Sequence, residues 1–251
     1  MTTDIHTHLG RNRMEYASVD KHNLAEHVDT HIQYMDLFGI ERAVLTPVEP
    51  NISTNLYKEA AAIYPDRFFW ACSLLPRPMN LAQTRLKEYE EEGCMALVLD
   101  ESQYHPDDPA VHILIQKAIQ LNLPVFFHQD SVTSKTAAFI DEISRTYENG
   151  KFVVLQMGGI FGFQNLLPII RRKNIWLEIS VTLARLVESP LRVFLDALIQ
   201  DMGVRSLVYG SEHWSEYPNL SAAMNMIDLN VETNRAIRKQ NAREIIGLAA
   251  Y

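Results

Sequence analysis

Two histidines near the start of the chain are spaced like a pair of metal ligands. His6 and His8 are separated by one residue in a short run of strand-forming residues. Side chains at positions i and i+2 of a strand point to the same face, so both imidazoles can reach one ion. Imidazole is a typical ligand of Zn²⁺ and of related divalent metals. The pair therefore indicates a metal site at the end of the first strand.

Two further residues could complete such a site. His128 follows the apolar run 125–127, and Glu212 directly follows a predicted strand that ends at residue 211. Three histidines and one carboxylate form a mononuclear site that leaves a position for water. There are plainer interpretations. His128 could be a buried core residue, and the pair at 6 and 8 could arise by chance among nine histidines.

The residues around these candidates predict a repeating unit of one strand and one helix. The predicted strands are 3–8, 42–48, 68–75, 96–100, 124–129, 152–157, 175–180 and 206–211. The predicted helices lie near 20–38, 53–64, 80–92, 109–121, 135–147, 163–171, 187–200, 219–228 and 231–247. Strands recur roughly every 29 residues, about the length of one strand–helix unit. Eight such units predict an α/β fold, a parallel sheet closed as a single (β/α)8 TIM-type barrel.

The predicted barrel explains why the candidate ligands would meet. Active sites of such barrels lie at the carboxyl ends of the strands, which is where His6, His8, His128 and Glu212 stand. An open, doubly wound sheet is the rival fold, but no glycine-rich phosphate loop follows an early strand. Glu178 lies within a predicted strand, and the sequence leaves open whether it faces the barrel interior or the helices.

Three arginines could bind a substrate at the same end of the barrel. Arg11 and Arg13 follow the first strand, and Arg77 follows the third. A guanidinium group suits two-pronged binding of a carboxylate. Ordinary surface charge is an equally good explanation of all three.

Other candidate ligands are weaker. His27 and His31 are spaced for one face of a helix, but Val28 stands where a zinc-protease motif needs glutamate. We expect these two histidines to lie on a solvated helix face. Cys72 and Cys94 lack metal-type spacing, so we expect free thiols.

Length and composition fit one globular domain. The chain has 251 residues, of which 47% are hydrophobic and 22% charged, and barrels of this size are commonly one domain, so we expect a single domain over 1–251. A net charge of −8 disfavours non-specific binding of nucleic acid or of an anionic membrane. The first residues do not resemble a signal peptide, and no run approaches the ~20 apolar residues of a membrane span. We therefore expect a cytoplasmic protein that acts on a small molecule.

Several motifs resemble the amidohydrolase superfamily, and more narrowly its amidohydrolase-related (amidohydrolase 2) branch. The opening Asp-Ile-His-Thr-His-Leu-Gly at 4–10 is the first of these. Weaker matches are Gly-Cys-Met-Ala-Leu at 93–97, Asn-Leu-Pro-Val-Phe-Phe-His at 122–128, Met-Gly-Gly at 157–159, Gly-Ser-Glu at 210–212 and Asn-Ala-Arg-Glu-Ile-Ile-Gly-Leu at 241–248. The branch includes metal-dependent decarboxylases, hydratases and lactonases. The resemblance implies a barrel, which agrees with the strand count.

The resemblance also implies a function. We expect a metal-dependent hydrolase acting on a small organic molecule, such as a carboxylate-bearing lactone or amide. His6, His8 and His128 would hold one divalent metal, with zinc expected and manganese as the alternative. The metal would lower the pKa of bound water. Glu212 would be the fourth ligand, the general base or both, and Gln156 would orient the substrate. Barrels of this branch often pair, so a homodimer is a further expectation.

Two positions depart from the pattern of the branch. Gln156 stands where histidine is usual, and Glu212 stands where aspartate is usual. Glutamine cannot shuttle a proton at neutral pH, whereas glutamate is chemically competent but one methylene longer. Two other functions therefore stay open. One is a decarboxylase or hydratase on the same scaffold, and the other is a catalytically degenerate barrel that only binds a ligand.

Overall fold

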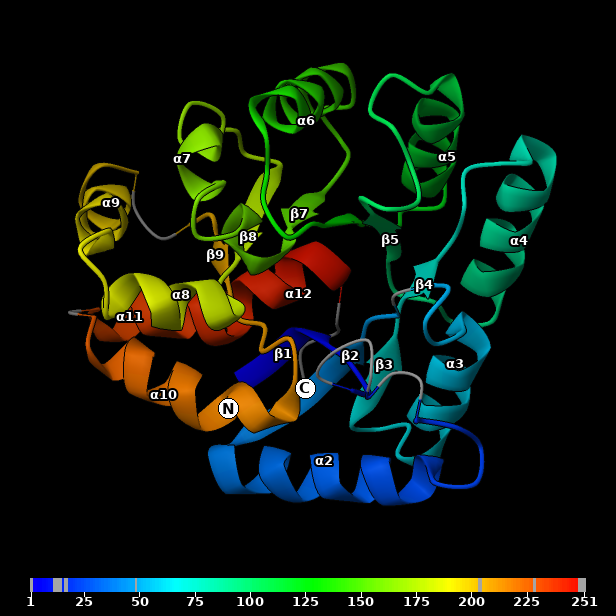
Figure 1. Cartoon of the computed structure of the whole chain (residues 1–251), viewed down its shortest axis with the longest axis horizontal. Helices are drawn as coiled ribbons and strands as arrows, with labels where there is room; N and C mark the ends of the chain where they lie inside the picture. Colours follow the sequence, from blue (N-terminus) through cyan, green and yellow to red (C-terminus); the bar gives the residue numbers. More distant parts are fainter. Residues whose placement is uncertain are drawn as a thin grey trace.

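Parallel strands and helices alternate around a ring in the computed structural model (Figure 1). The structure describes residues 2–10, 15, 18–47, 49–202, 205–227 and 229–247. The strands are β1 (Thr2–Thr7), β2 (Ile40–Leu45), β3 (Phe68–Trp70), β4 (Cys72–Ser73), β5 (Leu97–Asp100), β6 (Val125–His128), β7 (Phe152–Val154), β8 (Ile175–Glu178) and β9 (Leu207–Val208). Neighbours in this order pair in parallel, and β3 and β4 are two halves of the third strand, interrupted at Ala71. The predicted α/β barrel of the TIM type is confirmed.

The ring closes where β9 meets β1. The backbone N–H of Ile5 donates to the carbonyl of Tyr209 at 3.1 Å, and that of Ser211 donates to the carbonyl of His6 at 2.9 Å. Beyond the end of β9, Glu212 continues the pairing, because its carbonyl accepts the N–H of His8 at 2.8 Å. The residue predicted as the fourth ligand is therefore joined by its backbone to the histidine pair of β1.

Helices connect the strands and cover the outside of the ring. They are α2 (Leu24–Phe38), α3 (Thr54–Ile63), α4 (Met79–Glu91), α5 (Pro109–Gln120), α6 (Ser134–Thr146), α7 (Phe163–Leu166), α8 (Ser180–Val187), α9 (Arg192–Ala197), α10 (Tyr217–Asn225), α11 (Val231–Arg235) and α12 (Asn241–Ile246), with the shorter turns η1 (Leu155–Gly158), η2 (Leu198–Met202), η3 (Trp214–Glu216) and η4 (Ala236–Gln240). Side-chain caps start several of them. Asp108 accepts the N–H of Ala110 at α5, and Thr133 accepts that of Thr136 at α6. Within the described ranges, none of these helices combines the length and apolarity needed to cross a membrane.

Several predicted boundaries are wrong in the second half of the chain, including the strand predicted at 206–211, which is only Leu207–Val208, and the helix predicted near 163–171, which ends at Leu166. The strand predicted at 152–157 ends at Val154, because the backbone turns into η1, where Gln156 and Met157 take positive φ angles of 54° and 52°. The helix predicted near 187–200 is found as α9 and η2, and α8 precedes it where no helix was predicted. Hydrophobic periodicity does not reveal a turn that depends on left-handed backbone at non-glycine residues.

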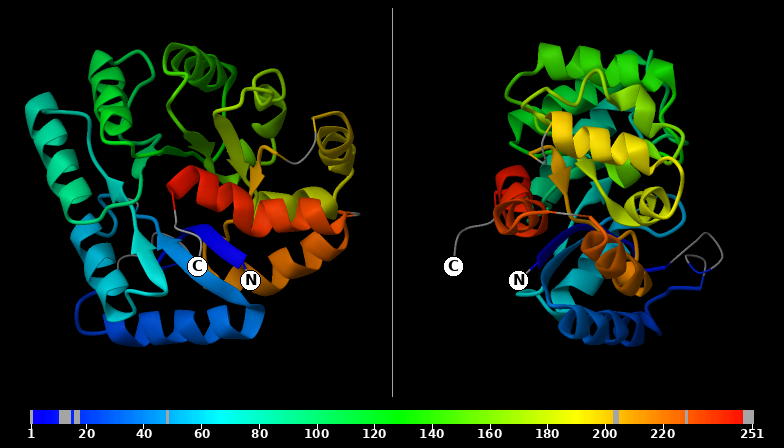
Figure 2. Two further views of the ribbon diagram at one scale, coloured as in Figure 1. Left: turned by 180° about the vertical axis from the view of Figure 1, so that it is seen from behind. Right: turned by 90° about the vertical axis from the view of Figure 1, so that its left-hand side faces the viewer.

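The amino-terminal end of the barrel is filled, which leaves the opposite end for chemistry. Inward-facing residues such as Val98, Phe126 and Trp176 form one buried cluster with Ala242 and Ile245 of α12. Seen from behind, α12 runs across this end of the strands (Figure 2). A second, larger cluster fills the space between the strands and the surrounding helices. The barrel is thus a packed core whose polar residues gather at the carboxyl ends of the strands.

Candidate metal centre

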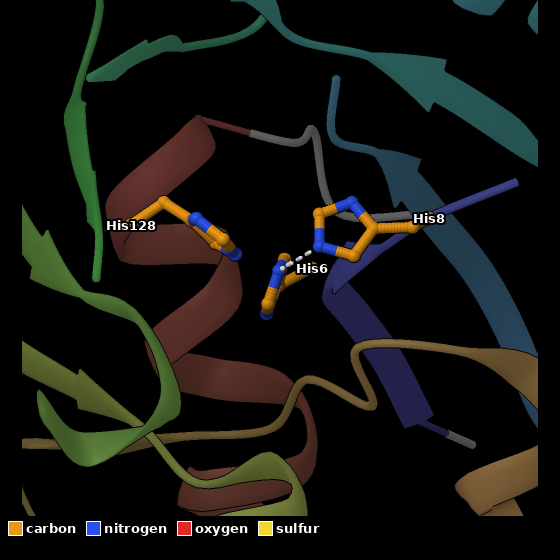
Figure 3. Close-up of side chains that lie close together, drawn as sticks. All are labelled: His6, His8 and His128. Carbon is orange, nitrogen blue, oxygen red and sulfur yellow. Dashed lines mark hydrogen bonds between the residues drawn. The ribbon is translucent and has the colours of Figure 1, made fainter. Parts of the chain in front are cut away.

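Three histidines converge at the carboxyl end of the barrel (Figure 3). His6 lies in β1, His8 follows that strand, and His128 is the last residue of β6. One ligand nitrogen from each lies within 4.8 Å of the others, and the Nε2 atoms of His6 and His8 are 3.1 Å apart. His6 and His8 are fully buried, and burial lowers their pKa values well below the usual range. Burial therefore favours the neutral form of both rings, the state in which imidazole binds a metal.

Glu178 of β8 holds the outer nitrogen of His6. Its Oε2 lies 2.8 Å from His6 Nδ1 and also accepts the backbone N–H of Gln156 at 2.8 Å. Its Oε1 accepts the N–H of Ser180, and burial raises the pKa of Glu178 to about 7. Gly210 leaves room for this carboxylate, since a Cβ there would lie 2.6 Å from Glu178 Cγ. Glu178 therefore faces the barrel interior, a question that the sequence left open.

The other two histidines are held in the same way by different acceptors. His8 Nδ1 lies 2.6 Å from the carbonyl oxygen of Thr46, beyond the end of β2. His128 Nδ1 lies 2.7 Å from Oδ2 of Asp100, the last residue of β5. Burial alone would lower the pKa of His128, but the hydrogen bond and charge of Asp100 outweigh it and raise that pKa. Each histidine thus has its Nδ1 on an oxygen acceptor at the periphery of the cluster.

Asp4 holds the backbone next to the histidine cluster. It was not among the predicted site residues. Its Oδ1 accepts the backbone N–H of His6 at 3.0 Å, and its Oδ2 accepts the hydroxyls of Ser211 at 2.6 Å and Tyr217 at 3.0 Å. Burial raises its pKa to about 7. Asp4 therefore ties β1 to the end of β9 and to α10. A signal was present, because an aspartate inside a predicted barrel strand needs buried partners.

The expectation for His31 is wrong. This residue of α2 is 1% exposed rather than solvated, and its Nε2 lies 3.0 Å from the hydroxyl of Tyr217. Its apolar neighbours on the helix, Leu24, Val28 and Met35, are buried at the spacing of one helical face. His31 shares that face, which is the sequence signal that the ligand spacing obscured. His27 is only partly buried.

Glu212 stands beside the histidines with an unusual backbone. Its φ is 66°, which is rare for a residue with a side chain. Its Oε2 is buried without a hydrogen-bond partner among the described residues, and burial, followed by the charge of Glu178, raises its pKa to about 7. The group of ligand atoms within 4.8 Å contains the three histidines and, among described residues, no carboxylate. Glu212 thus places a buried Oε2 near the site but is not a member of that tight group.

The remaining predicted residues lie in three different situations. Gln156 is 8% exposed at the end of β7, and its backbone N–H is bound by Glu178. Arg77 is exposed and makes two hydrogen bonds to the carboxylate of Asp108, at 2.9 and 2.7 Å. Arg11 and Arg13 lie outside the described residues. The structure therefore gives Arg77 a carboxylate partner from the protein itself.

Comparisons with known proteins agree with the barrel fold. A family profile described as amidohydrolase matches residues 3–248. No curated protein matches the sequence. The structure resembles a probable 2-pyrone-4,6-dicarboxylic acid hydrolase from Acinetobacter baumannii with citric acid bound, with 19% identity, a TM-score of 0.75 and coverage of 98% of this chain and 99% of that one.

Two decarboxylases are similar in structure as well. The 2,6-dihydroxybenzoate decarboxylase from Rhizobium shows 14% identity and a TM-score of 0.74, with 98% of each chain covered. The 5-carboxyvanillate decarboxylase from Novosphingobium aromaticivorans, complexed with manganese and 4-hydroxy-3-methoxy-5-nitrobenzoic acid, shows 13% identity and a TM-score of 0.72, with 99% of this chain and 96% of that one covered. At such identities these likenesses establish the barrel fold and not the reaction.

Proposed function

The chain belongs to the amidohydrolase family, and from that premise we propose that it is a metal-dependent hydrolase of a small, carboxylate-bearing organic molecule. The observation that carries the proposal is the convergence of three histidine nitrogens at the carboxyl end of the barrel. The same end of this fold holds the active sites of other barrel enzymes.

The chemistry of the donor set fits a divalent metal. A carbonyl oxygen can only accept a hydrogen bond, so the neutral His8 ring carries its proton on Nδ1. Its Nε2 then has no proton and presents a lone pair. His6 faces the carboxyl group of Glu178, whose ionised form likewise accepts the proton of Nδ1, and this places a second lone pair 3.1 Å from the first. Two such nitrogens repel each other unless a proton or a metal ion lies between them. His6, His8 and His128 would hold the ion, for which we propose zinc, with manganese as the alternative. Bound there, the ion would act as a Lewis acid.

The chain's own residues supply the proton chemistry in this proposal. Glu212 has a buried Oε2 without a partner among the described residues, which is free to accept a proton from water or to act as a further ligand. Gln156 can donate and accept hydrogen bonds through its amide, so we assign it to orienting the substrate. The barrel interior beneath this end is apolar and buried, and a surround of low polarity strengthens electrostatic interactions of this kind.

The carboxylate-bearing substrate is inferred from the relatives. The hydrolase among them is named for a dicarboxylic acid, and the two decarboxylases are named for substituted benzoates. The decarboxylases also make a lyase the second candidate, because a lyase would use the same histidines.

One experiment tests the metal and the reaction type. The purified protein is loaded with Zn²⁺ or Mn²⁺, its bound metal is counted, and it is screened with lactones, amides and aromatic or unsaturated acids. Hydrolysis of a lactone releases a proton and hydrolysis of an amide releases an amine, in both cases with no CO2, whereas decarboxylation releases CO2. We expect one ion per chain and a hydrolysis product without CO2. Metal content near zero in the presence of excess metal would refute the proposed centre, and CO2 release would favour the lyase.

A further inference from the structure

Resting on the metal centre proposed above, we propose that Asp100 is a positioning residue that fixes the tautomer of His128. Asp100 would hold the proton of His128 on Nδ1. The Nε2 atom, which faces the other two histidines, would then have a free lone pair. Asp100 itself would touch neither metal nor substrate. In the sequence this residue ends the predicted strand 96–100 and could reach the same end of the barrel.

The pair is built by strand register. Asp100 and His128 are the last residues of β5 and β6, and they are direct partners in the parallel pairing of those strands. The backbone also ties them together just beyond the strands, where the N–H of Glu101 donates to the carbonyl of His128 at 3.0 Å. A contact placed by paired strands is more rigid than one placed by loops. The 2.7 Å separation of Asp100 Oδ2 and His128 Nδ1 is therefore a fixed feature of the barrel.

The hydrogen bonds around Asp100 determine which atom must donate. Its Oδ1 accepts the backbone N–H of Ser102 at 2.9 Å and the hydroxyl of the same residue. Its Oδ2 remains for His128, and an ionised carboxylate can only accept. His128 must then be the donor, so its proton is on Nδ1 and Nε2 has no proton in the neutral ring.

At all three histidines the Nδ1 atom is the donor and an oxygen is the acceptor. The carbonyl of Thr46 and the carboxylate of Glu178 accept from the Nδ1 atoms of His8 and His6. Three different acceptors on three different strands or strand ends thus produce one result. A proton on any of the inner nitrogens would occupy a coordination position. Partners of this kind fix ring orientation and tautomer and typically change metal affinity by about ten- to hundredfold when they are mutated.

The substitution Asp100→Asn tests this with almost no change of shape. The backbone N–H of Ser102 requires an oxygen, so the amide oxygen of the introduced side chain stays there and its NH2 group faces His128. Nδ1 must then accept, and the proton moves to Nε2. We expect nitrogen NMR of the metal-free protein, at mildly alkaline pH, to show an Nδ1–H tautomer for His128 in the wild type and an Nε2–H tautomer in the variant. We expect calorimetric titration with Zn²⁺ to show affinity about ten- to hundredfold lower in the variant.

Asp107→Asn is the matched control. Asp107 also pairs with a histidine, His105, at 3.5 Å, but both side chains are about two-thirds exposed. We expect this variant to keep the His128 tautomer and the Zn²⁺ affinity of the wild type. Circular dichroism checks that each variant is folded.

The outcomes separate this inference from the proposed function. Failure of the wild type to bind Zn²⁺ or Mn²⁺ would overturn the metal centre, and the tautomers would still be measurable. If the wild type binds metal but Asp100→Asn keeps both tautomer and affinity, the role of Asp100 is wrong. If the variant does not fold, the spectrum of the metal-free wild type is the test. An Nδ1–H signal for His128 supports the inference, and an Nε2–H signal contradicts it.

Discussion

Buried His31 should make the stability of the protein depend on pH in a calculable way. Its Nε2 faces the hydroxyl of Tyr217, which itself donates to Asp4, so Nε2 carries the proton of the neutral ring. Its Nδ1 is buried and has no partner among the described residues. A second proton would have to sit on that nitrogen. Burial, with a smaller contribution from the charge of His213, lowers the pKa of His31 from 6.5 to about 3.

The sign and size of the effect follow from linkage. Between pH 6.5 and about 3 the unfolded chain binds a proton at residue 31 and the native protein does not. The free energy of unfolding therefore falls as the pH falls through this window. At pH 5, which is roughly 1.5 pH units below the unfolded pKa of 6.5, protonation of residue 31 stabilises the unfolded state by about 2 kcal/mol relative to pH 8. For a chain of this size that corresponds to a change of roughly 4–8 °C in the melting temperature.

The assay compares wild type with His31→Gln, which keeps an N–H donor for Tyr217 and removes the titrating ring. We expect the wild type to lose about 2 kcal/mol relative to this variant between pH 8 and pH 5, measured by urea unfolding at each pH. His27→Gln, one turn earlier on α2 and partly exposed, controls for the effect of the substitution on the helix. A difference between wild type and His31→Gln that is the same at both pH values would refute the reasoning.

Three further predictions concern the candidate site. Glu212→Asp should lower kcat/KM by about a hundredfold, because a displacement of about 1 Å of a catalytic group has that effect, and Glu212→Gln should be lower still; parental activity of Glu212→Gln would exclude a proton-accepting role. Gly210→Ala should destabilise the protein by about 1–3 kcal/mol, since the added Cβ would lie 2.6 Å from Glu178 Cγ, and an unchanged melting temperature would show that the carboxylate can move aside. His128→Ala should abolish metal binding while the fold persists, because this side chain lies at the partly accessible end of the barrel; a variant that loses stability but keeps its metal would mark His128 as a packing residue.

The barrel was predictable because its signal is local and repeated. Apolar strands and amphipathic helices alternate at nearly constant spacing, and a closed parallel sheet is the arrangement that buries them all. The same logic brought three histidines to one end of the barrel, since a strand that ends in histidine delivers it there. His6, His8 and His128 needed no knowledge of side-chain contacts, only of where strands stop.

The acceptors behind the histidines could not be predicted in this way. Thr46 contributes a backbone carbonyl, which no residue type reveals. Glu178 and Asp100 are recognisable as carboxylates, but their partners depend on which face of the strand points inward and on register between strands. A one-residue shift would turn either carboxylate outward. The prediction for His31 is wrong because it treats this residue as the partner of His27 and not as part of the buried face of α2.

The two departures from the family pattern have a common structural feature. Gln156 and Glu212 both take positive φ angles, of 54° and 66°, and left-handed backbone of this kind is maintained only where the surroundings fix it. At position 156 the group that is held is the backbone N–H, bound to the same Oε2 of Glu178 that holds His6. At position 212 the backbone carbonyl accepts the N–H of His8. These contacts do not depend on which side chain is present. In the proposed site, glutamine in place of histidine and glutamate in place of aspartate would therefore change what is offered to a substrate, while the backbone contacts to Glu178 and His8 would be preserved.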